Sequence, residues 1–227
     1  MSQNQSLPDQ SLPVFPVQKG KLFVVSAPSG AGKTTVVTAL ITRMTAAGES
    51  LERVITYTTR ALRLGERDGV DYHFISVSEF ECKIKEGFFI NWSGAYGNYY
   101  GLPQSIIEQA QQGRSFILVL DRAGAQEVLA KEPSAVLVWL YTHTLDILHA
   151  RLVGRGTDTP DQIAYRLALA QQEYELEKQK PLFHHHILND FVENAVTKFE
   201  NIVRLELAHS LASNRSNSAS GRAISEI

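Results

Sequence analysis

The chain has 227 residues, of which 44% are hydrophobic and 20% charged, and this suits one globular domain or one domain with insertions. Its formal net charge of -2 at pH 7 gives no overall positive field, so we expect no nucleic-acid partner and local clusters for binding anions. The single cysteine, Cys82, excludes an intramolecular disulfide, and the apolar runs are too short to span a bilayer, so we expect a cytoplasmic protein without a membrane partner.

The two ends of the chain differ in composition from the rest. Residues 1–18 are rich in Gln, Ser and Pro, and residues 213–227 are rich in Ser and Asn. Neither segment has enough apolar surface to offset the entropy of ordering, so we expect poorly ordered tails.

The first elements read as a strand, a turn and a helix. KLFVVS, residues 21–26, is a short apolar run that predicts a buried strand. The next pattern places five apolar residues on one helical face and ends near Gly48. These five residues are Val36, Val37, Leu40, Ile41 and Met44. Residues 52–103 are dense in Tyr, Gly, Thr and Arg without long helical periodicity, so we expect an insertion of short strands and turns.

The second half of the chain alternates strands and helices. FILVLD (116–121) and AVLVWLY (135–141) are continuous apolar runs that suit a parallel sheet covered on both faces. Helical patterns lie at 104–113 and 144–152. Thr159, Pro160 and Gln162 predict the start of a helix that runs to about residue 177. HHHILND (184–190) predicts the last strand and 192–207 the last helix, which gives an α/β fold.

A glycine-rich segment between the first strand and the first helix resembles a phosphate-binding loop. The window from Ala27 to Thr34 fits G-x-x-x-x-G-K-[ST], except that Ala27 replaces the first glycine. Backbone N–H groups near Gly30 and Gly32 suit phosphate, Lys33 adds a positive charge, and the hydroxyl of Thr34 suits Mg²⁺. We therefore predict a nucleoside triphosphate site, formed by Ser29, Gly30, Ala31, Gly32, Lys33, Thr34 and Thr35.

Two further segments raise the question of a metal. Asp121, at the end of an apolar run, suits either support of Mg²⁺ together with Thr34 or the cap of a following helix. In a strand, the run from His184 to His186 places at most two imidazoles on one face and has no partner cysteine. We expect these histidines to begin a strand rather than to bind metal.

A second anion site is indicated by TYTTRALRLGERDGVDYHF, residues 56–74. Arg60 and Arg63 stand close to threonines and to Tyr72, and arginine side chains bind phosphate oxygens through two parallel hydrogen bonds. A solvated charged turn is the alternative interpretation of the same residues.

Several motifs in a consistent order together resemble guanylate kinase. They are S-x-P-S-G-x-G-K-T, T-T-R-x-x-R-x-G-E-x-x-G-x-D-Y-x-F, W-x-x-x-x-G-N-x-Y-G, R-L-x-x-R-G-T-D and N-D, between about residues 21 and 207. The resemblance implies a P-loop nucleoside monophosphate kinase with a parallel core sheet, a small mixed-strand insertion for the acceptor and a helical lid. It implies core segments at 19–52, 104–145 and 178–212, the insertion at 53–103 and the lid at 146–177.

The resemblance also implies roles for individual residues. Lys33, Arg155 and Arg166 would be catalytic, and Arg151 and Arg155 would join the ATP site. The acceptor monophosphate would be bound by Thr56, Arg60, Arg63, Tyr72, Asn91, Tyr100, Leu102 and Asp121. The implied reaction is transfer of the γ-phosphoryl group of ATP, with Mg²⁺, to GMP or dGMP.

Three departures from the family pattern lie at the base rather than at the phosphates. Asn91 stands where the family usually has glutamate, Leu102 where it has a small hydroxyl residue, and Val119 where it has an aspartate. A carboxylate accepts both the N1–H and N2 donors of guanine, whereas an amide accepts one and presents a donor to the other. Three interpretations remain: a guanylate kinase with a rearranged base pocket, a kinase with another base specificity, or a non-catalytic binding module of the same fold.

Overall fold

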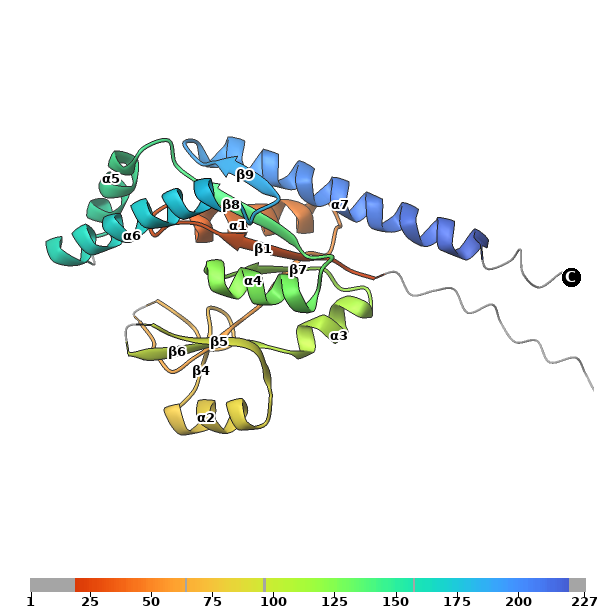
Figure 1. The fold of residues 1–227 in the computed structure, drawn as a ribbon, viewed down its shortest axis with the longest axis horizontal. Helices are drawn as coiled ribbons and strands as arrows, with labels where there is room; N and C mark the ends of the chain where they lie inside the picture. Colours follow the sequence, from red (N-terminus) through yellow and green to blue (C-terminus); the bar gives the residue numbers. More distant parts are fainter. Residues whose placement is uncertain (1–18, 64, 96, 157, 221–227) are drawn as a thin grey trace, which may run out of the picture.

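The computed structural model describes residues 19–63, 65–95, 97–156 and 158–220 (Figure 1). The tails expected at 1–18 and beyond residue 220 lie outside this part of the chain. None of the helices in the described part is both long enough and apolar enough to cross a lipid bilayer.

A five-stranded sheet with the spatial order β2-β7-β1-β8-β9 forms the centre of the molecule. Every adjacent pair is parallel. The strands are β1 (Leu22–Ser26), β2 (Glu52–Arg53), β7 (Phe116–Val119), β8 (Val136–Tyr141) and β9 (His185–Leu188). The apolar runs therefore form the predicted parallel sheet, because only strands covered on both faces bury consecutive apolar residues.

Helices cover both faces of this sheet and give three layers (Figure 1). On one side, Phe23 and Val25 pack in a cluster with residues of α1 (Lys33–Ala46) and α7 (Val192–Ser220). On the other side, Leu22 and Val24 pack with α3 (Ser105–Gln111) and α4 (Arg122–Lys131). The predicted apolar face of α1 is confirmed, since Val36, Val37, Leu40 and Met44 are buried and Ile41 packs against the cluster.

The insertion is a small mixed sheet in the order β4-β3-β6-β5, below the core in Figure 1. Its strands are β3 (Tyr57–Thr58), β4 (His73–Phe74), β5 (Phe89–Ala95) and β6 (Asn98–Pro103). β3 pairs with β4 in parallel, whereas the other two pairs are antiparallel.

The expectation of strands and turns alone in the insertion was incomplete. A helix, α2 (Val77–Lys85), connects β4 to β5 and buries Phe80. A capping box between Ser76 and Glu79 begins it, and that S-x-x-E signal is visible in the sequence. Trp92 on β5 is 45% exposed, because alternate residues of this strand face solvent.

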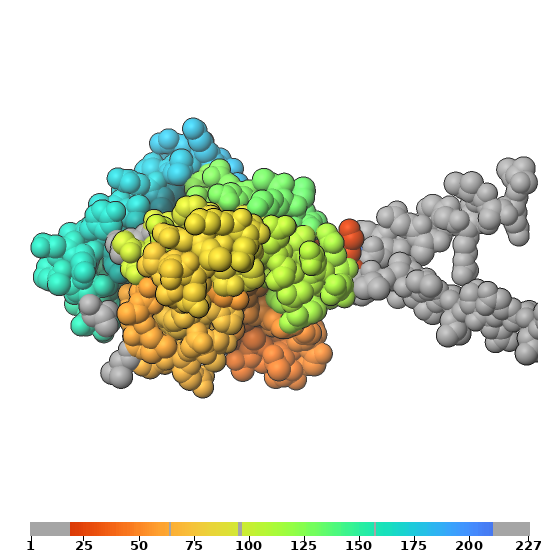
Figure 2. Space-filling model, turned by 90° about the horizontal axis from the view of Figure 1, so that it is seen from below, coloured from red at the N-terminus to blue at the C-terminus, as the bar shows by residue number. Residues whose placement is uncertain are grey.

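Two helices at one end of the sheet, α5 (Leu145–Arg155) and α6 (Pro160–Gln179), occupy the segment expected to be a lid. The side chain of Thr159 accepts a hydrogen bond from the backbone N–H of Gln162, whose side chain caps Thr159 in return, as the sequence predicts. Seen from below, the insertion fills the centre of one face, with these helices, coloured cyan, at its left edge (Figure 2).

The end of the last helix differs from the sequence expectation. Helix α7 continues to Ser220, so residues 213–220 are helical, where we expected a poorly ordered tail. Each residue added to an established helix gains a backbone hydrogen bond without a new nucleation cost, which favours continuation of a helix that is packed at its beginning.

Candidate active site

The loop between β1 and α1 is shaped by two glycines with left-handed backbone angles. Gly30 has φ 87° and Gly32 has φ 90°, a region that other residues rarely adopt. A Cβ on Gly32 would lie 2.5 Å from Nδ2 of Asn189, so no side chain fits at this position. The loop thus brings backbone N–H groups to the amino end of α1, where the helix dipole favours an anion.

Lys33 is the first residue of α1 and folds back over the loop. Its Nζ donates hydrogen bonds to the backbone carbonyls of Ala27 and Pro28. Burial lowers the pKa of Lys33 to about 8, while Glu173 acts in the opposite direction and Arg155 adds to the lowering. The hydroxyls of Thr34 and Thr35 are on exposed residues of the first turn.

Arg151 and Asn189 hold this loop in place through hydrogen bonds to its backbone. Arg151 Nη2 donates to the carbonyl of Asn189 at 2.8 Å, and Asn189 Nδ2 donates to the carbonyl of Ala31 at 2.7 Å. Arg151 Nη1 also reaches the carbonyl of Ala31 at 3.5 Å. The arginine predicted for the ATP site therefore lies beside the loop, together with the asparagine of the N-D motif.

Arg60 is held in place by neighbours in the insertion. Its Nη2 donates to Oε1 of Glu66 at 2.7 Å, and its guanidinium lies 5.4 Å from the ring centroid of Tyr72. The pKa of Arg60 is raised, mainly by its hydrogen bond to Glu66, so the guanidinium stays charged. Sequence reasoning did not assign a role to Glu66, although the glutamate is part of the motif T-T-R-x-x-R-x-G-E.

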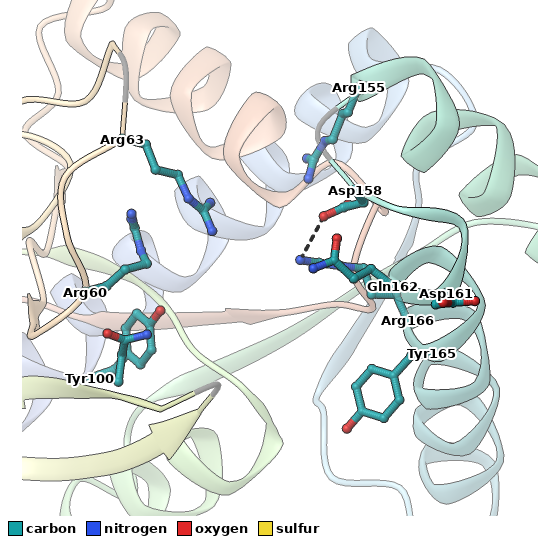
Figure 3. A pocket seen from close by; sticks show the side chains of 10 residues that line it. Arg60, Arg63, Tyr100, Arg155, Asp158, Asp161, Gln162, Tyr165 and Arg166 are labelled. Atoms are coloured by element: carbon teal, nitrogen blue, oxygen red, sulfur yellow. Dashed lines mark ion pairs between the residues drawn. The ribbon is translucent and has the colours of Figure 1, made fainter.

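A cleft of about 560 Å³ separates the insertion from α5 and α6 (Figure 3). Arg60, Arg63 and Tyr100 lie on one wall, and Arg155 and Arg166 lie on the other. Four arginines predicted as site residues thus face one cavity. Arginine guanidinium groups without a matching number of carboxylates favour a polyanionic ligand there.

The wall of the cleft next to α5 and α6 contains an ion pair that sequence reasoning missed. Arg166 Nη2 lies 3.4 Å from Oδ1 of Asp158, and Arg166 Nη1 donates to Oγ of Ser29 at 2.7 Å. Arg166 therefore connects α6 directly to the phosphate-binding loop. Asp158 follows the R-G-T segment, and its place in that motif was the available signal.

A smaller cavity of about 180 Å³ opens where the insertion meets the carboxyl ends of the core strands. It brings together most of the residues predicted for the acceptor, while Arg60 and Arg63 line only the larger cleft. The predicted acceptor residues that line this cavity are Thr56, Tyr72, Asn91, Tyr100, Leu102 and Asp121. Val119 also lines the cavity, and Ser93, which sequence reasoning missed, lies two residues after Asn91 on β5.

Asp121 has the capping role that was one of its two interpretations. Its Oδ1 accepts a hydrogen bond from the backbone N–H of Gly124 at 2.8 Å and so caps α4. The same residue lines the smaller cavity and raises the pKa of Lys33 through its charge. A cap and a place beside the phosphate loop are therefore compatible in this fold.

Glu173 is a carboxylate on the inner face of α6 without a sequence-based assignment. Arg166, Ala170, Glu173 and Glu177 follow one another at helical spacing, and Ala170 and Glu177 are buried. Burial raises the pKa of Glu173, whereas the charge of Lys33 lowers it. The i, i+7 spacing from Arg166 was the signal that could have found it.

The three consecutive histidines have three different partners. His184 Nδ1 accepts a hydrogen bond from the backbone N–H of Leu137. Nε2 of His185 lies 3.9 Å from Oε1 of Glu206, and Nε2 of His186 lies 2.9 Å from Oε1 of Glu177. Within the described part of the chain, no group of three or more His, Cys, Asp or Glu residues is arranged to hold a metal ion.

Comparisons with known proteins agree with this geometry. The family model described as guanylate kinase matches residues 19–206. A protein named guanylate kinase from Dechloromonas aromatica (strain RCB) is 41% identical over 186 residues, which are 82% of this chain and 89% of that protein. One from Symbiobacterium thermophilum is 38% identical over 194 residues, 85% of this chain and 89% of that protein. The crystal structure of guanylate kinase from Anaplasma phagocytophilum superposes with a TM-score of 0.67 at 26% identity, covering 84% of this chain and 87% of that one.

Proposed function

The chain belongs to the guanylate kinase family, and from this premise we propose that it transfers the γ-phosphoryl group of ATP to GMP or dGMP. An oxygen of the acceptor phosphate forms a bond to the γ-phosphorus, and the bond from that phosphorus to the bridging oxygen of ADP breaks. The products are ADP and GDP or dGDP. The proposal places the reaction in the cytoplasm, where both substrates are available.

The observation that carries the proposal is the arrangement of cations around the cleft. Arg60 and Arg63 come from the insertion, Arg155 and Arg166 come from the lid, and Lys33 lies at the base of the phosphate loop. Phosphoryl transfer depends mainly on positioning two anions in line and on neutralising charge, so it requires no protein nucleophile. Positive groups on two sides of one cavity meet that requirement.

The donor site uses the phosphate loop. We assign the triphosphate to the backbone N–H groups and side chains from Ser29 to Thr35, with Lys33 leaving its carbonyl partners to contact phosphate oxygens. Arg155 and Arg166 approach the transferring group from the lid, and Arg151 keeps the loop in position. Arg166 already reaches the loop through Ser29, which supports this assignment.

The acceptor site uses the insertion. We assign the acceptor phosphate to Arg60, Arg63, Tyr72 and Tyr100, and the base to the smaller cavity between β5, β6 and Asp121. Glu66 and the ring of Tyr72 orient Arg60 before the substrate arrives. Such preorganisation lowers the cost of binding a phosphate.

The oxygen donors near the phosphate loop fit Mg²⁺. The hydroxyl of Thr34 is exposed at the first turn of α1, and the carboxylate of Asp121 acts electrostatically on Lys33 at the same end of the sheet. Hydroxyl and carboxylate oxygens are ligands that Mg²⁺ accepts. We assign these two residues to the metal, which would neutralise charge on the phosphates when bound.

Measurement of ADP release tests the proposal directly. Purified protein with ATP and Mg²⁺ would be assayed against GMP, dGMP, AMP, CMP and UMP in a coupled assay. We expect turnover with GMP, and Lys33→Ala to reduce kcat by roughly a hundredfold or more, since one charge on the transition state is lost. The matched control is Lys178→Ala on the exposed outer part of α6, which should retain wild-type turnover.

Two results would contradict the proposal. Turnover that does not depend on Lys33 would indicate a contaminating kinase. Absence of turnover with every acceptor, in protein that binds GMP, would favour the interpretation as a non-catalytic binding module of the same fold.

A further inference from the structure

The base cavity contains a side-chain amide that is open to a ligand. Asn91 on β5 is paired in register with Leu102 on β6, and both line the cavity. In the part of the chain that the structure describes, we find no hydrogen bond from the Asn91 carboxamide to another residue. Its carbonyl oxygen and its NH₂ group are therefore both available to a bound base.

The other walls of the cavity supply few alternatives to this amide. Leu102 is 1% exposed, and Leu102 and Val119 are apolar, so neither donates a hydrogen bond. Asp121 lines the cavity as well: its Oδ1 accepts from the backbone N–H of Gly124 and caps α4, and its second carboxylate oxygen is a further acceptor. The remaining polar side chains are hydroxyls, and each offers a single oxygen to a base edge: Thr56, Tyr72, Ser93 and Tyr100.

The chemistry of a carboxamide matches one edge of a 6-oxopurine. O6 is an acceptor and N1–H is an adjacent donor, so NH₂ and C=O of one amide can form two parallel hydrogen bonds with them. In this pairing the NH₂ group of Asn91 donates a hydrogen bond to O6, which the apolar side chain of Leu102 cannot do. It makes no contact with the amino group at position 2, which is the group that distinguishes guanine from hypoxanthine.

We propose that Asn91 binds the O6 and N1–H edge of the acceptor base, so that the chain phosphorylates 6-oxopurine nucleoside monophosphates with or without a 2-amino group, IMP as well as GMP. The inference rests on the proposed function, because it concerns the acceptor of that reaction. It adds a second acceptor and names the residue that admits it.

The orientation of the amide in the structure distinguishes 6-oxopurines from adenine. Oδ1 of Asn91 lies 3.4 Å, and Oδ1 of Asp121 lies 3.3 Å, from the point that a Cβ on Gly124 would occupy, beside the amino end of α4. The positive end of the α4 dipole favours the amide oxygen on that side, whereas the carboxylate of Asp121 favours the NH₂ group. Adenine reverses the donor and the acceptor of a 6-oxopurine, so the amide would have to turn by half a rotation to pair with it.

The wild-type enzyme provides the first test, through kcat/KM for GMP, IMP and AMP at saturating ATP and Mg²⁺. Discrimination through the 2-amino group requires a partner that pairs with it, and a site built for such a group rejects the analogue that lacks it strongly. We expect GMP to exceed IMP by less than about tenfold in kcat/KM, and IMP to exceed AMP. A larger preference for GMP over IMP, or a preference for AMP over IMP, would overturn the inference.

Substitution of the amide provides the second test. Asn91→Asp keeps the shape but replaces the donor by an acceptor, which suits N1–H and the 2-amino group and opposes O6. We expect the ratio of kcat/KM for GMP to that for IMP to rise by roughly ten- to a hundredfold, as expected for one charged hydrogen bond. The control Trp92→Phe changes the next residue, whose side chain lies on the opposite face of β5, and should leave the ratio unchanged.

Calorimetric titration with GMP and IMP separates the possible failures. Turnover of GMP without binding or turnover of IMP would overturn only the inference about Asn91. Absence of turnover with both nucleotides would remove the proposed function, and the inference with it. An unchanged ratio in Asn91→Asp would assign recognition of the base to other residues of the cavity.

Discussion

At the scale of single residues, the charge of Lys33 depends on its neighbours. Glu173 on α6 and Asp121 after β7 raise its pKa, while burial and Arg155 on α5 lower it, and the result is about 8. The free enzyme therefore holds a charged ammonium below pH 8 and loses that charge as the pH rises through this value. ATP binding should weaken over the same range, because a neutral amine no longer attracts the triphosphate.

Removal of the Glu173 charge should move this transition. Glu173→Gln removes a negative charge that raises the pKa of Lys33, so burial and Arg155 should lower that pKa further. The fall in kcat/KM for ATP at alkaline pH should therefore begin at lower pH. At pH 8.5 we expect kcat/KM to be about threefold below wild type, with little change at pH 6.5, as for a shift of about half a pH unit. A pH profile from 6 to 9.5 measures this directly.

A residue elsewhere on α6 provides the control for that profile. Glu175 is exposed and bonds to Gln171, so Glu175→Gln should reproduce the wild-type curve. An identical alkaline limb in wild type and Glu173→Gln would show that Glu173 does not act on Lys33. An equal loss of kcat/KM at every pH would indicate a structural role for Glu173 instead.

At the scale of elements, α6 is anchored at its carboxyl end and lines the cleft near its amino end. Glu177 is buried and accepts hydrogen bonds from Arg122 of α4 and from the backbone N–H groups of Leu182 and Phe183. Its Oε1 also lies 2.9 Å from Nε2 of His186 on β9. Near the other end, Arg166 faces the cleft and the phosphate loop. One helix thus joins the core sheet to the wall of the cleft that contains Arg166.

The anchor should contribute strongly to stability. Glu177→Gln removes a charge that several donors share and leaves Arg122 without its carboxylate, a change that typically costs about 3 kcal/mol for a buried pair. We expect a lower free energy of unfolding in urea by roughly this amount, whereas the exposed substitution Glu175→Gln should remain within about 0.5 kcal/mol of wild type. A loss below about 1 kcal/mol for Glu177→Gln would contradict a cooperative anchor.

Periodicity predicted the core elements well because their burial is local and repetitive. The strands β1, β7 and β8 are continuous apolar runs, and the cap formed by Thr159 and Gln162 is a short-range signal. Within the insertion, α2 was missed although Val77, Phe80 and Ile84 recur at helical spacing, because the helix has only 9 residues and buries Phe80 alone. The contacts of Glu66 with Arg60 and of Glu173 with Lys33 depend on packing, so the motif that contains Glu66 and the spacing of Glu173 from Arg166 indicate these residues without giving their partners.

At the scale of the whole molecule, the cleft carries a charge imbalance that substrates would relieve. Arg60 and Arg63 face Arg155 and Arg166 across it, with Asp158 and Asp161 as the carboxylates among its lining residues. Like charges on opposite walls oppose approach of the insertion and the lid. Two bound nucleotides bring several negative charges between the walls and remove this opposition, so closure should accompany substrate binding.

The single cysteine makes this closure measurable. Cys82 is exposed on α2 of the insertion, and Val153, 51% exposed on α5, is a suitable site for a second cysteine. In spin-labelled Val153→Cys protein, we expect the distance distribution between the two labels to shift to shorter values with GMP and a non-hydrolysable ATP analogue together, and less with either alone. Adding Arg63→Ala and Arg155→Ala should abolish most of the shift, since each wall loses a phosphate partner. An unchanged distance distribution with both nucleotides bound would mean that the cleft is already in its reactive geometry. Catalysis would then depend on local movement of Lys33 rather than on approach of the two walls.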